Sequence, residues 1–202
     1  MTTTTTTKKI LILGCGSLGS NTAMTIARSL SYEVEFDLVD HDVIENKNLA
    51  NQPWLDFNVG QKKATVLKAV LWHVAKSKAV SHIVKIQSKT DLRKVKKPDL
   101  IIDCFDNPAA RNLSQTMATE IFKTDILHAG FSEDGFLCSW NLEFEIQGNA
   151  SVSREPICDR RELARIVQIG SALAAEAAYQ YLVNNVQRKY YFHLFNGNFF
   201  TC

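Results

Sequence analysis

A glycine-rich turn between an apolar run and a helical pattern is the sequence feature that most restricts the fold of this chain. Residues 10–13 (ILIL) are typical of a buried strand in a parallel sheet. Six turn residues follow them directly: Gly14, Cys15, Gly16, Ser17, Leu18 and Gly19. From Leu18 to Leu30, apolar and small residues recur at three- and four-residue steps, which predicts a helix. A strand, a tight turn and a helix in this order predict the first unit of an α/β fold.

The remaining segments continue this alternation and then depart from it. The predicted strands are 34–40, 83–86, 100–104 and 126–129, and the predicted helices are 61–76 and one that starts at Pro108. Strict period-two alternation over 136–146 predicts an antiparallel strand, followed by a long helix at 161–182 and a strand at 190–195. We expect a doubly wound, Rossmann-like α/β fold with a mainly parallel sheet and an antiparallel C-terminal extension. It forms one domain over residues 1–202, with residues 1–8 flexible.

Composition excludes several other classes of protein. The chain has 202 residues, of which 46% are hydrophobic and 22% are charged, so a folded globule is expected. Its net charge of +2 argues against a nucleic-acid partner, which would need a dense basic face. Five cysteines without a C-x-x-C pair predict reduced thiols and no zinc site. The sequence has no signal core and no membrane span, so we expect a cytoplasmic protein without a membrane partner.

The glycine turn matches the pattern G-x-G-x-x-G, in which each glycine has a physical purpose. Gly14 permits the tight turn, Gly16 lets the backbone approach a phosphate, and Gly19 allows close helix–strand packing. Asp40 ends the second predicted strand, 21 residues after Gly19, where a ribose-binding carboxylate is expected. Together these features predict nucleotide binding, and the alternative is a purely structural turn. The glycine turn and Asp40 fit a nicotinamide dinucleotide and ATP equally well.

Four later segments decide between these nucleotides. They are DHDVIENKNLANQ at 40–52, VGQKKA at 59–64, DCFDN at 103–107 and IGSALAAE at 169–176. These segments resemble, in order, the motifs D-x-D-x-V-x-x-x-N-L-x-R-Q, V-G-x-x-K-A, D-C-x-D-N and I-G-x-x-x-A-x-E of the ubiquitin-activating enzyme superfamily. Its bacterial members are adenylyltransferases of the MoeB/ThiF/HesA type. The resemblance extends over about residues 9–182.

This resemblance implies MgATP-dependent adenylation of a carboxylate, with the C-terminal glycine of a ubiquitin-like or sulfur-carrier protein as the expected substrate. It implies that Asp40 holds the ribose, Lys63 neutralises phosphate charge and Asp106 holds Mg²⁺. The full set of implied nucleotide-binding residues is Gly14, Gly16, Ser17, Leu18, Gly19, Asp40, Asp42, Asn48, Gln52, Lys63, Asp106 and Asn107. It also implies a homodimer, with a heterodimer as the alternative.

Four of these residues also have purely structural interpretations. Lys63 has the alternative of an exposed helix lysine, like its neighbour Lys62. Asp106 and Asn107 precede Pro108, so they have the alternative of a helix N-cap. Asn48 has the alternative of a loop asparagine that bonds to its own backbone.

Two arginines that the superfamily places near the phosphates are missing from this sequence. Asn51 occupies the first position, and no arginine occurs in the nine residues before the first predicted strand. Arg111, Lys47 and Arg154 are candidates to compensate. The loss leaves open a second function, that of a non-catalytic nucleotide- or partner-binding subunit of a heteromer. A third candidate is an NAD(P)-dependent dehydrogenase, which the glycine turn and Asp40 alone would support.

Two further features have open roles. Some relatives place a thioester- or persulfide-forming cysteine near the position of Cys158, which makes Cys158 a candidate nucleophile. The alternative is an ordinary reduced cysteine at a helix start. In the long loop, Trp54, Phe57 and Val59 either anchor the loop to the core or clamp a substrate tail.

Overall fold

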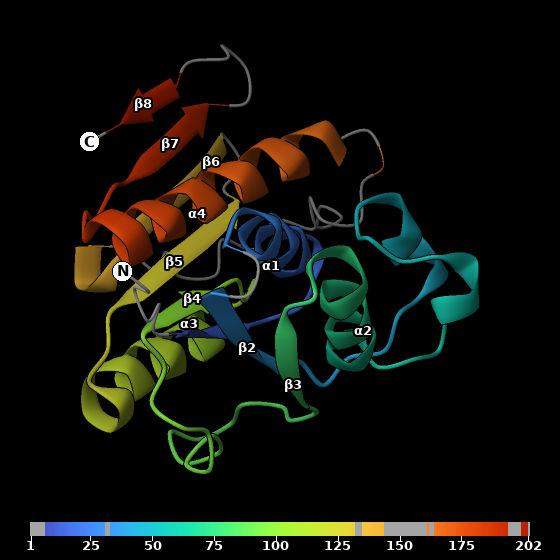
Figure 1. The fold of residues 1–202 in the computed structure, drawn as a ribbon, viewed down its shortest axis with the longest axis horizontal. Coiled ribbons are helices and arrows are strands. Elements are labelled where there is room, and N and C mark those ends of the chain that lie inside the picture. The colour runs from blue at the N-terminus through green and yellow to red at the C-terminus, as the bar shows by residue number, and fades with distance from the viewer. Residues whose placement is uncertain are drawn as a thin grey trace, which may run out of the picture.

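One mixed sheet organises the described part of the computed structural model, which comprises residues 7–30, 33–131, 135–143, 161, 164–193 and 199–201 (Figure 1). Within it the strands are β1 (Lys8–Leu13), β2 (Val34–Val39), β3 (Lys78–His82), β4 (Leu100–Asp103), β5 (Ile126–Phe131), β6 (Gly135–Trp140), β7 (Tyr190–His193) and β8 (Phe199–Thr201). Their order is β3-β2-β1-β4-β5-β6-β7-β8. The pairs from β3 to β5 are parallel, and those from β5 to β8 are antiparallel. The predicted fold class is confirmed.

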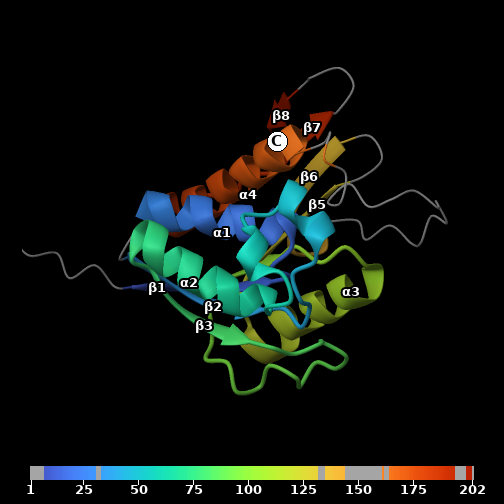
Figure 2. The same ribbon diagram turned by 90° about the vertical axis from the view of Figure 1, so that its right-hand side faces the viewer.

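Helices cover both faces of this sheet. The α-helices are α1 (Ser17–Leu30), α2 (Lys63–Ala75), α3 (Pro108–Thr116) and α4 (Ala164–Asn184). Shorter turns are η2 (Asn46–Ala50), η3 (Asp56–Asn58), the π-helical η4 (Met117–Phe122) and η5 (Asn141–Glu143). Helices α1, α2 and α4 lie on one face and α3 on the other (Figures 1 and 2). None of the helices in the described residues is long and apolar enough to cross a membrane.

The apolar β1 segment forms a central strand because it can bury side chains on both faces. Ile10 and Ile12 belong to the core beneath α1, α2 and α4, whereas Leu11 and Leu13 belong to a second core with residues of η4. Successive side chains of a strand point to opposite faces, so a strand between two helical layers must be apolar throughout. This burial fixes the end of β1, and therefore the start of the glycine turn, in the middle of the sheet.

The structure corrects the prediction of a strand at 83–86. The edge strand is Lys78–His82, which pairs with β2 in the register Glu35↔Lys78 to Val39↔His82. An edge strand tolerates exposed side chains, so polar Lys78 and Ser81 are acceptable there. The more apolar segment that follows leaves the sheet edge, and its Ile86 is buried in the second core. Apolar content therefore misplaced this strand by several residues.

Two other boundaries also differ from the predictions. The antiparallel strand predicted at 136–146 ends at Trp140, because Asn141 adopts a left-handed backbone with a φ of 51° and begins η5. Leu142, which the alternation places in the core, is 80% exposed, and residues 144–146 lie outside the described residues. The four-residue spacing of Leu113, Met117 and Ile121 predicts that all three face the core, but Ile121 is exposed because the π-helical turn η4 rotates the helix face.

Polar contacts fix α4 to the start of β5 at the far end of the sheet. The Tyr181 hydroxyl donates to Asp125 Oδ2 at 2.8 Å, and Asn141 Nδ2 donates to Asp125 Oδ1 at 2.9 Å. The Tyr181 ring also lies 4.9 Å from the Trp140 ring, measured between centroids. Burial, and then the bond to Asp125, raise the pKa of Tyr181 to about 12. The neutral phenol is therefore the form that the folded protein favours.

Removing the Tyr181 hydroxyl is expected to destabilise the fold. Tyr181→Phe should lower the free energy of unfolding by about 1 kcal/mol at pH 7, measured by urea denaturation, because Asp125 loses one donor. The folded-state pKa is raised above the unfolded value, so this stabilisation is lost as pH rises from about 10 to about 12. Tyr179→Phe is the matched control, since its hydroxyl has no hydrogen bond within the described residues. Equal stabilities for the two variants would contradict the assignment.

Candidate functional site

A cavity of about 640 Å³ lies at the carboxyl ends of β1, β2, β3 and β4. Residues just beyond each of these strands line it, so four separate stretches of sequence meet there. This is the position at which open α/β sheets bind ligands. All the nucleotide-binding residues predicted from the sequence line this cavity except Gly19: Gly14, Gly16, Ser17, Leu18, Asp40, Asp42, Asn48, Gln52, Lys63, Asp106 and Asn107.

The glycine turn is held by contacts that only glycine permits. Gly14 has a φ of 89°, in the left-handed region, and its N–H donates to the Val39 carbonyl at 2.9 Å. A Cβ on Gly19 would lie 1.9 Å from the Gly14 carbonyl oxygen, so α1 approaches the turn too closely for any side chain there. A Cβ on Gly16 would meet no atom within 4 Å. The N-terminus of α1 therefore opens into the cavity, where the N–H groups of its first turn and the helix dipole favour an anion.

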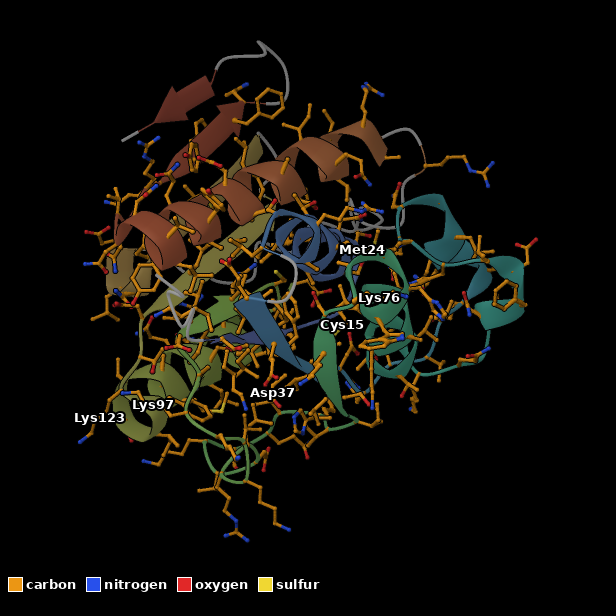
Figure 3. All side chains as sticks on the ribbon, in the orientation of Figure 1. Cys15, Met24, Asp37, Lys76, Lys97 and Lys123 are labelled. Carbon is orange, nitrogen blue, oxygen red and sulfur yellow. The ribbon has the colours of Figure 1, made fainter. Side chains whose placement is uncertain are left out.

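Asp40 joins the end of β2 to the glycine turn. Its Oδ2 accepts the Cys15 N–H at 2.8 Å, and its Oδ1 accepts the Asp42 N–H at 2.8 Å. Burial raises the pKa of Asp40, while the two backbone bonds and the nearby Lys63 oppose that rise. Cys15, labelled in Figure 3, is buried beside this carboxylate, and burial raises the pKa of its thiol well above the usual range. Asp40 thus fixes the turn and keeps lone pairs available for ligand hydroxyls.

Lys63 is a buried lysine at the first turn of α2. Only 8% of it is exposed, and its Nζ donates to Asp42 Oδ2 at 3.1 Å. Its neighbour Lys62 is exposed and donates to the His41 carbonyl at 2.6 Å. The alternative of an exposed helix lysine therefore describes Lys62 and not Lys63. Burial of an ammonium group is costly without a partner, so its placement in the cavity wall depends on Asp42.

The loop after β2 reaches the cavity through Asn48 and Gln52. Asn48 Oδ1 accepts the Glu45 N–H at 3.0 Å, so this side chain does bond to its own loop, as the structural alternative proposed, and it also lines the cavity. Gln52 Oε1 accepts the indole N–H of buried Trp54 at 2.7 Å. Trp54 therefore anchors the loop, whereas Phe57 is 73% exposed and does not.

Asp106 and Asn107 follow β4 and have different roles. Asn107 Oδ1 accepts the Ala110 N–H at 2.8 Å and caps α3, with Pro108 at its first position. Asp106 is exposed in the cavity and has no hydrogen bond or ion pair with any described residue. A carboxylate with free oxygens fits Mg²⁺, which binds one or two carboxylates together with phosphates and water.

A buried polar cluster, which the sequence analysis did not predict, lies behind this loop. Asp103 Oδ2 accepts from Arg111 Nη1 at 3.3 Å and lies 2.7 Å from His128 Nδ1. Arg111 Nη2 donates to the Ala129 carbonyl at 2.8 Å, and His128 Nε2 lies 2.9 Å from Gln115 Oε1. The cluster joins β4, α3 and β5. Arg111 therefore points away from the cavity, so its candidacy as a compensating phosphate cation is wrong.

One wall of the cavity was not predicted from the sequence. Its residues are Val84, Lys85, Ile86, Gln87, Phe105 and Leu113. Val84, Phe105 and Leu113 pack against the second core, in which Ile86 is buried, so this wall offers a mainly apolar surface. No motif marks the segment after β3, and only the apolar character of residues 83–86 could have drawn attention to it.

The other residues that the sequence analysis named differ in their relation to the cavity. Asn51 is buried and does not line it. Lys47 lines it, and Arg154 lies outside the described residues. Cys158 also lies outside them and stays a prediction. The period-two alternation predicts that Cys138 faces the core, and it is buried; burial raises the pKa of its thiol to about 12, which disfavours the thiolate.

The sheet order and the glycine turn at its centre define a doubly wound, Rossmann-like α/β protein with a cavity at the carboxyl ends of its parallel strands. Residues 3–200 match the ThiF family. The chain therefore belongs to the ThiF family, as the resemblance predicted.

Named relatives agree with this membership. The chain is 29% identical over 137 residues to adenylyltransferase and sulfurtransferase UBA4 of Eremothecium gossypii, covering 67% of this chain and 30% of that protein. It is 28% identical over 136 residues to a probable molybdopterin-synthase adenylyltransferase of Porphyra purpurea, covering 66% of this chain and 35% of that protein. The chain thus spans about a third of the length of these curated relatives.

Solved structures share the fold. A crystal structure of Escherichia coli MccB with succinimide superposes with a TM-score of 0.79 at 20% identity, covering 96% of this chain and 63% of that one. A crystal structure of the same protein with ATP gives a TM-score of 0.78 at 19% identity, with the same coverage. At this identity the likeness establishes the architecture alone.

Two glycine variants test the packing of the turn. Gly19→Ala should lower the free energy of unfolding by about 3 kcal/mol or more in urea denaturation, because its Cβ meets a backbone oxygen that cannot move aside. Gly16→Ala, in the same turn, should change it by less than about 1 kcal/mol, because open space surrounds its Cβ. A Gly19→Ala protein as stable as Gly16→Ala would show that α1 does not approach β1 this closely.

Proposed function

We propose that this protein is a MgATP-dependent adenylyltransferase that activates the C-terminal carboxylate of a ubiquitin-like or sulfur-carrier protein. The observation that carries the proposal is the convergence on one cavity of the glycine turn, buried Asp40, buried Lys63 and Asp106, which has no described partner. No two of these features are close enough in sequence for local structure to bring them together.

Each part of the cavity suits one part of the nucleotide. The apolar wall with Ile86 and Phe105 suits a flat base, and Asp40 suits the ribose hydroxyls. The N-terminus of α1 and the Lys63 ammonium suit the phosphates. Bound Mg²⁺ would neutralise part of the triphosphate charge, and Asp106 would hold it.

In the proposed reaction the acceptor carboxylate attacks the α-phosphorus of ATP. A new oxygen–phosphorus bond forms, the bond to the bridging oxygen breaks, and pyrophosphate leaves with that electron pair. The product is an acyl-adenylate. The chain's residues would act by positioning the reactants and by stabilising negative charge, because no proton transfer is needed from the carboxylate at neutral pH.

The names of other proteins support this proposal. The relatives in Eremothecium and Porphyra are called adenylyltransferases, and MccB has been crystallised with ATP. A cytoplasmic location and a homodimer, with a heterodimer of related subunits as the alternative, also belong to the proposal. They rest on the sequence alone.

A second candidate function is a nucleotide- or partner-binding subunit without activity of its own. The burial of Asn51 favours it, because no cation replaces the family arginine at that position. A dehydrogenase would leave Lys63 and Asp106 without a role, and we do not propose one.

Nucleotide titrations test the first step of the proposal. The protein should bind MgATP and not NADH in isothermal titration calorimetry. Asp106→Ala should weaken MgATP binding about tenfold or more, because a metal ligand is lost. It should not weaken binding of ATP in the presence of a chelator, because no metal then needs the carboxylate. Asp56→Ala, in η3 and outside the cavity lining, is the control and should bind MgATP as the wild type does.

The adenylation step is tested by ATP–pyrophosphate exchange. Exchange should require a ubiquitin-like carrier that ends in glycine and should fail with the same carrier lacking that residue. Lys63→Met should slow it by roughly 10²–10³-fold, the usual effect of removing one positioned charge donor, whereas the control Lys62→Met should not. MgATP binding without exchange, for every carrier offered, would favour the non-catalytic subunit instead.

A further inference from the structure

The net formal charge of the groups that line the cavity does not by itself favour a polyphosphate. Within the described residues, the lining carries four carboxylates and three ammonium groups, which gives a formal charge of −1 with His41 neutral. The carboxylates belong to Asp40, Asp42, Glu45 and Asp106, and the ammonium groups belong to Lys47, Lys63 and Lys85. A nucleoside triphosphate is itself highly negative, so its binding depends on how these three lysines are used.

Two of the three lysines already have carboxylate partners. Lys63 Nζ lies 3.1 Å from Asp42 Oδ2, and Lys47 Nζ lies 3.6 Å from Glu45 Oε2. In each pair the carboxylate offsets the positive charge that the lysine would otherwise offer to a phosphate. Lys85 differs, because it has no ion pair or hydrogen bond with any residue in the described part of the chain. Its whole charge is therefore available to a ligand.

The backbone around Lys85 is fixed by packing and by a closed turn. On either side of it, Val84 packs against the second core and Ile86 is buried in it. Asp91 then accepts the Gln87 N–H at 2.7 Å, and it also accepts the N–H and the hydroxyl of Ser88 at 2.9 and 2.8 Å. Lys85 thus stands on a rigid wall of the cavity, so binding a ligand would order only its side chain.

No other candidate cation in the described part of the chain provides the missing charge. Asn51 is only 4% exposed and lies outside the lining, and Arg111 is bonded to Asp103 and the Ala129 carbonyl. Lys97 and Lys123 lie far from Cys15 and its glycine turn (Figure 3). They line a separate depression of about 500 Å³ that shares no residue with this cavity.

We propose that Lys85 is a nucleotide-binding residue whose ammonium group attracts the phosphates, in place of the arginine that the superfamily has at position 51. This inference rests on the proposed nucleotide binding and adds a residue that none of the sequence motifs contains. Because the interaction is Coulombic, its contribution must grow with the charge of the ligand and decrease with added salt.

Calorimetric titration of Lys85→Gln with adenosine, AMP and MgATP tests the proposal. The dissociation constant should be unchanged for adenosine and raised about fivefold for MgATP at low salt, with a smaller rise at 0.5 M NaCl. Lys85→Arg keeps the charge and should restore affinity. Lys94→Gln is the matched control, because Lys94 is another exposed lysine without a described partner and lies outside the cavity lining.

The other outcomes each have a definite meaning. An equal loss for adenosine and MgATP would overturn the proposal, because it would indicate a contact with the nucleoside or a structural effect. An unchanged MgATP affinity in Lys85→Gln, with a wild type that binds MgATP and responds to Asp106→Ala, would overturn it while leaving the proposed function intact. A wild-type protein that binds no nucleotide would overturn both.

Discussion

The close approach of helix α1 to the end of β1 is the constraint on which the rest of the structure depends. A Cβ at Gly19 would lie 1.9 Å from the Gly14 carbonyl oxygen, so the helix can lie against the strand only because that position has no side chain. This contact aims the N-terminus of α1 at the carboxyl ends of the parallel strands. Asp40 then holds the turn from β2 through the Cys15 N–H. A cavity suited to an anion follows from these two contacts.

The other half of the cavity depends on a buried carboxylate. Asp103 is fully buried at the end of β4, and Arg111 and His128 approach the same oxygen of its side chain. Removing such groups from water is costly, and their mutual attraction offsets that cost only when the geometry is well satisfied. The cluster ties β4, α3 and β5 together and so fixes the loop that presents Asp106. Asp106, which faces the cavity, has no partner among the described residues, whereas Asp103 behind it contacts both Arg111 and His128.

Sequence reasoning succeeded where a motif required a particular backbone and failed where only apolar content was available. The glycine turn was predicted, and the N-cap at Asn107 was recognised as the structural alternative for that residue, because glycine and proline have specific backbone requirements. The strand at 83–86 was misplaced because an edge strand can be polar, so that Lys78–His82 gave no pattern. The cavity wall that contains Lys85 was missed because no motif marks the segment after β3.

The sequence by itself determined the doubly wound fold, the family and nearly all the motif residues of the cavity, because each of these is written in local patterns of a few residues. Only the tertiary structure decided which of two adjacent lysines is buried, that Arg111 turns away from the cavity, and that Lys85 stands in its wall without a partner among the described residues. The physical reason is that burial and charge pairing depend on contacts between segments far apart in the chain, and no local pattern encodes them. The direction of the Lys63 side chain is set by Asp42, 21 residues earlier in the sequence.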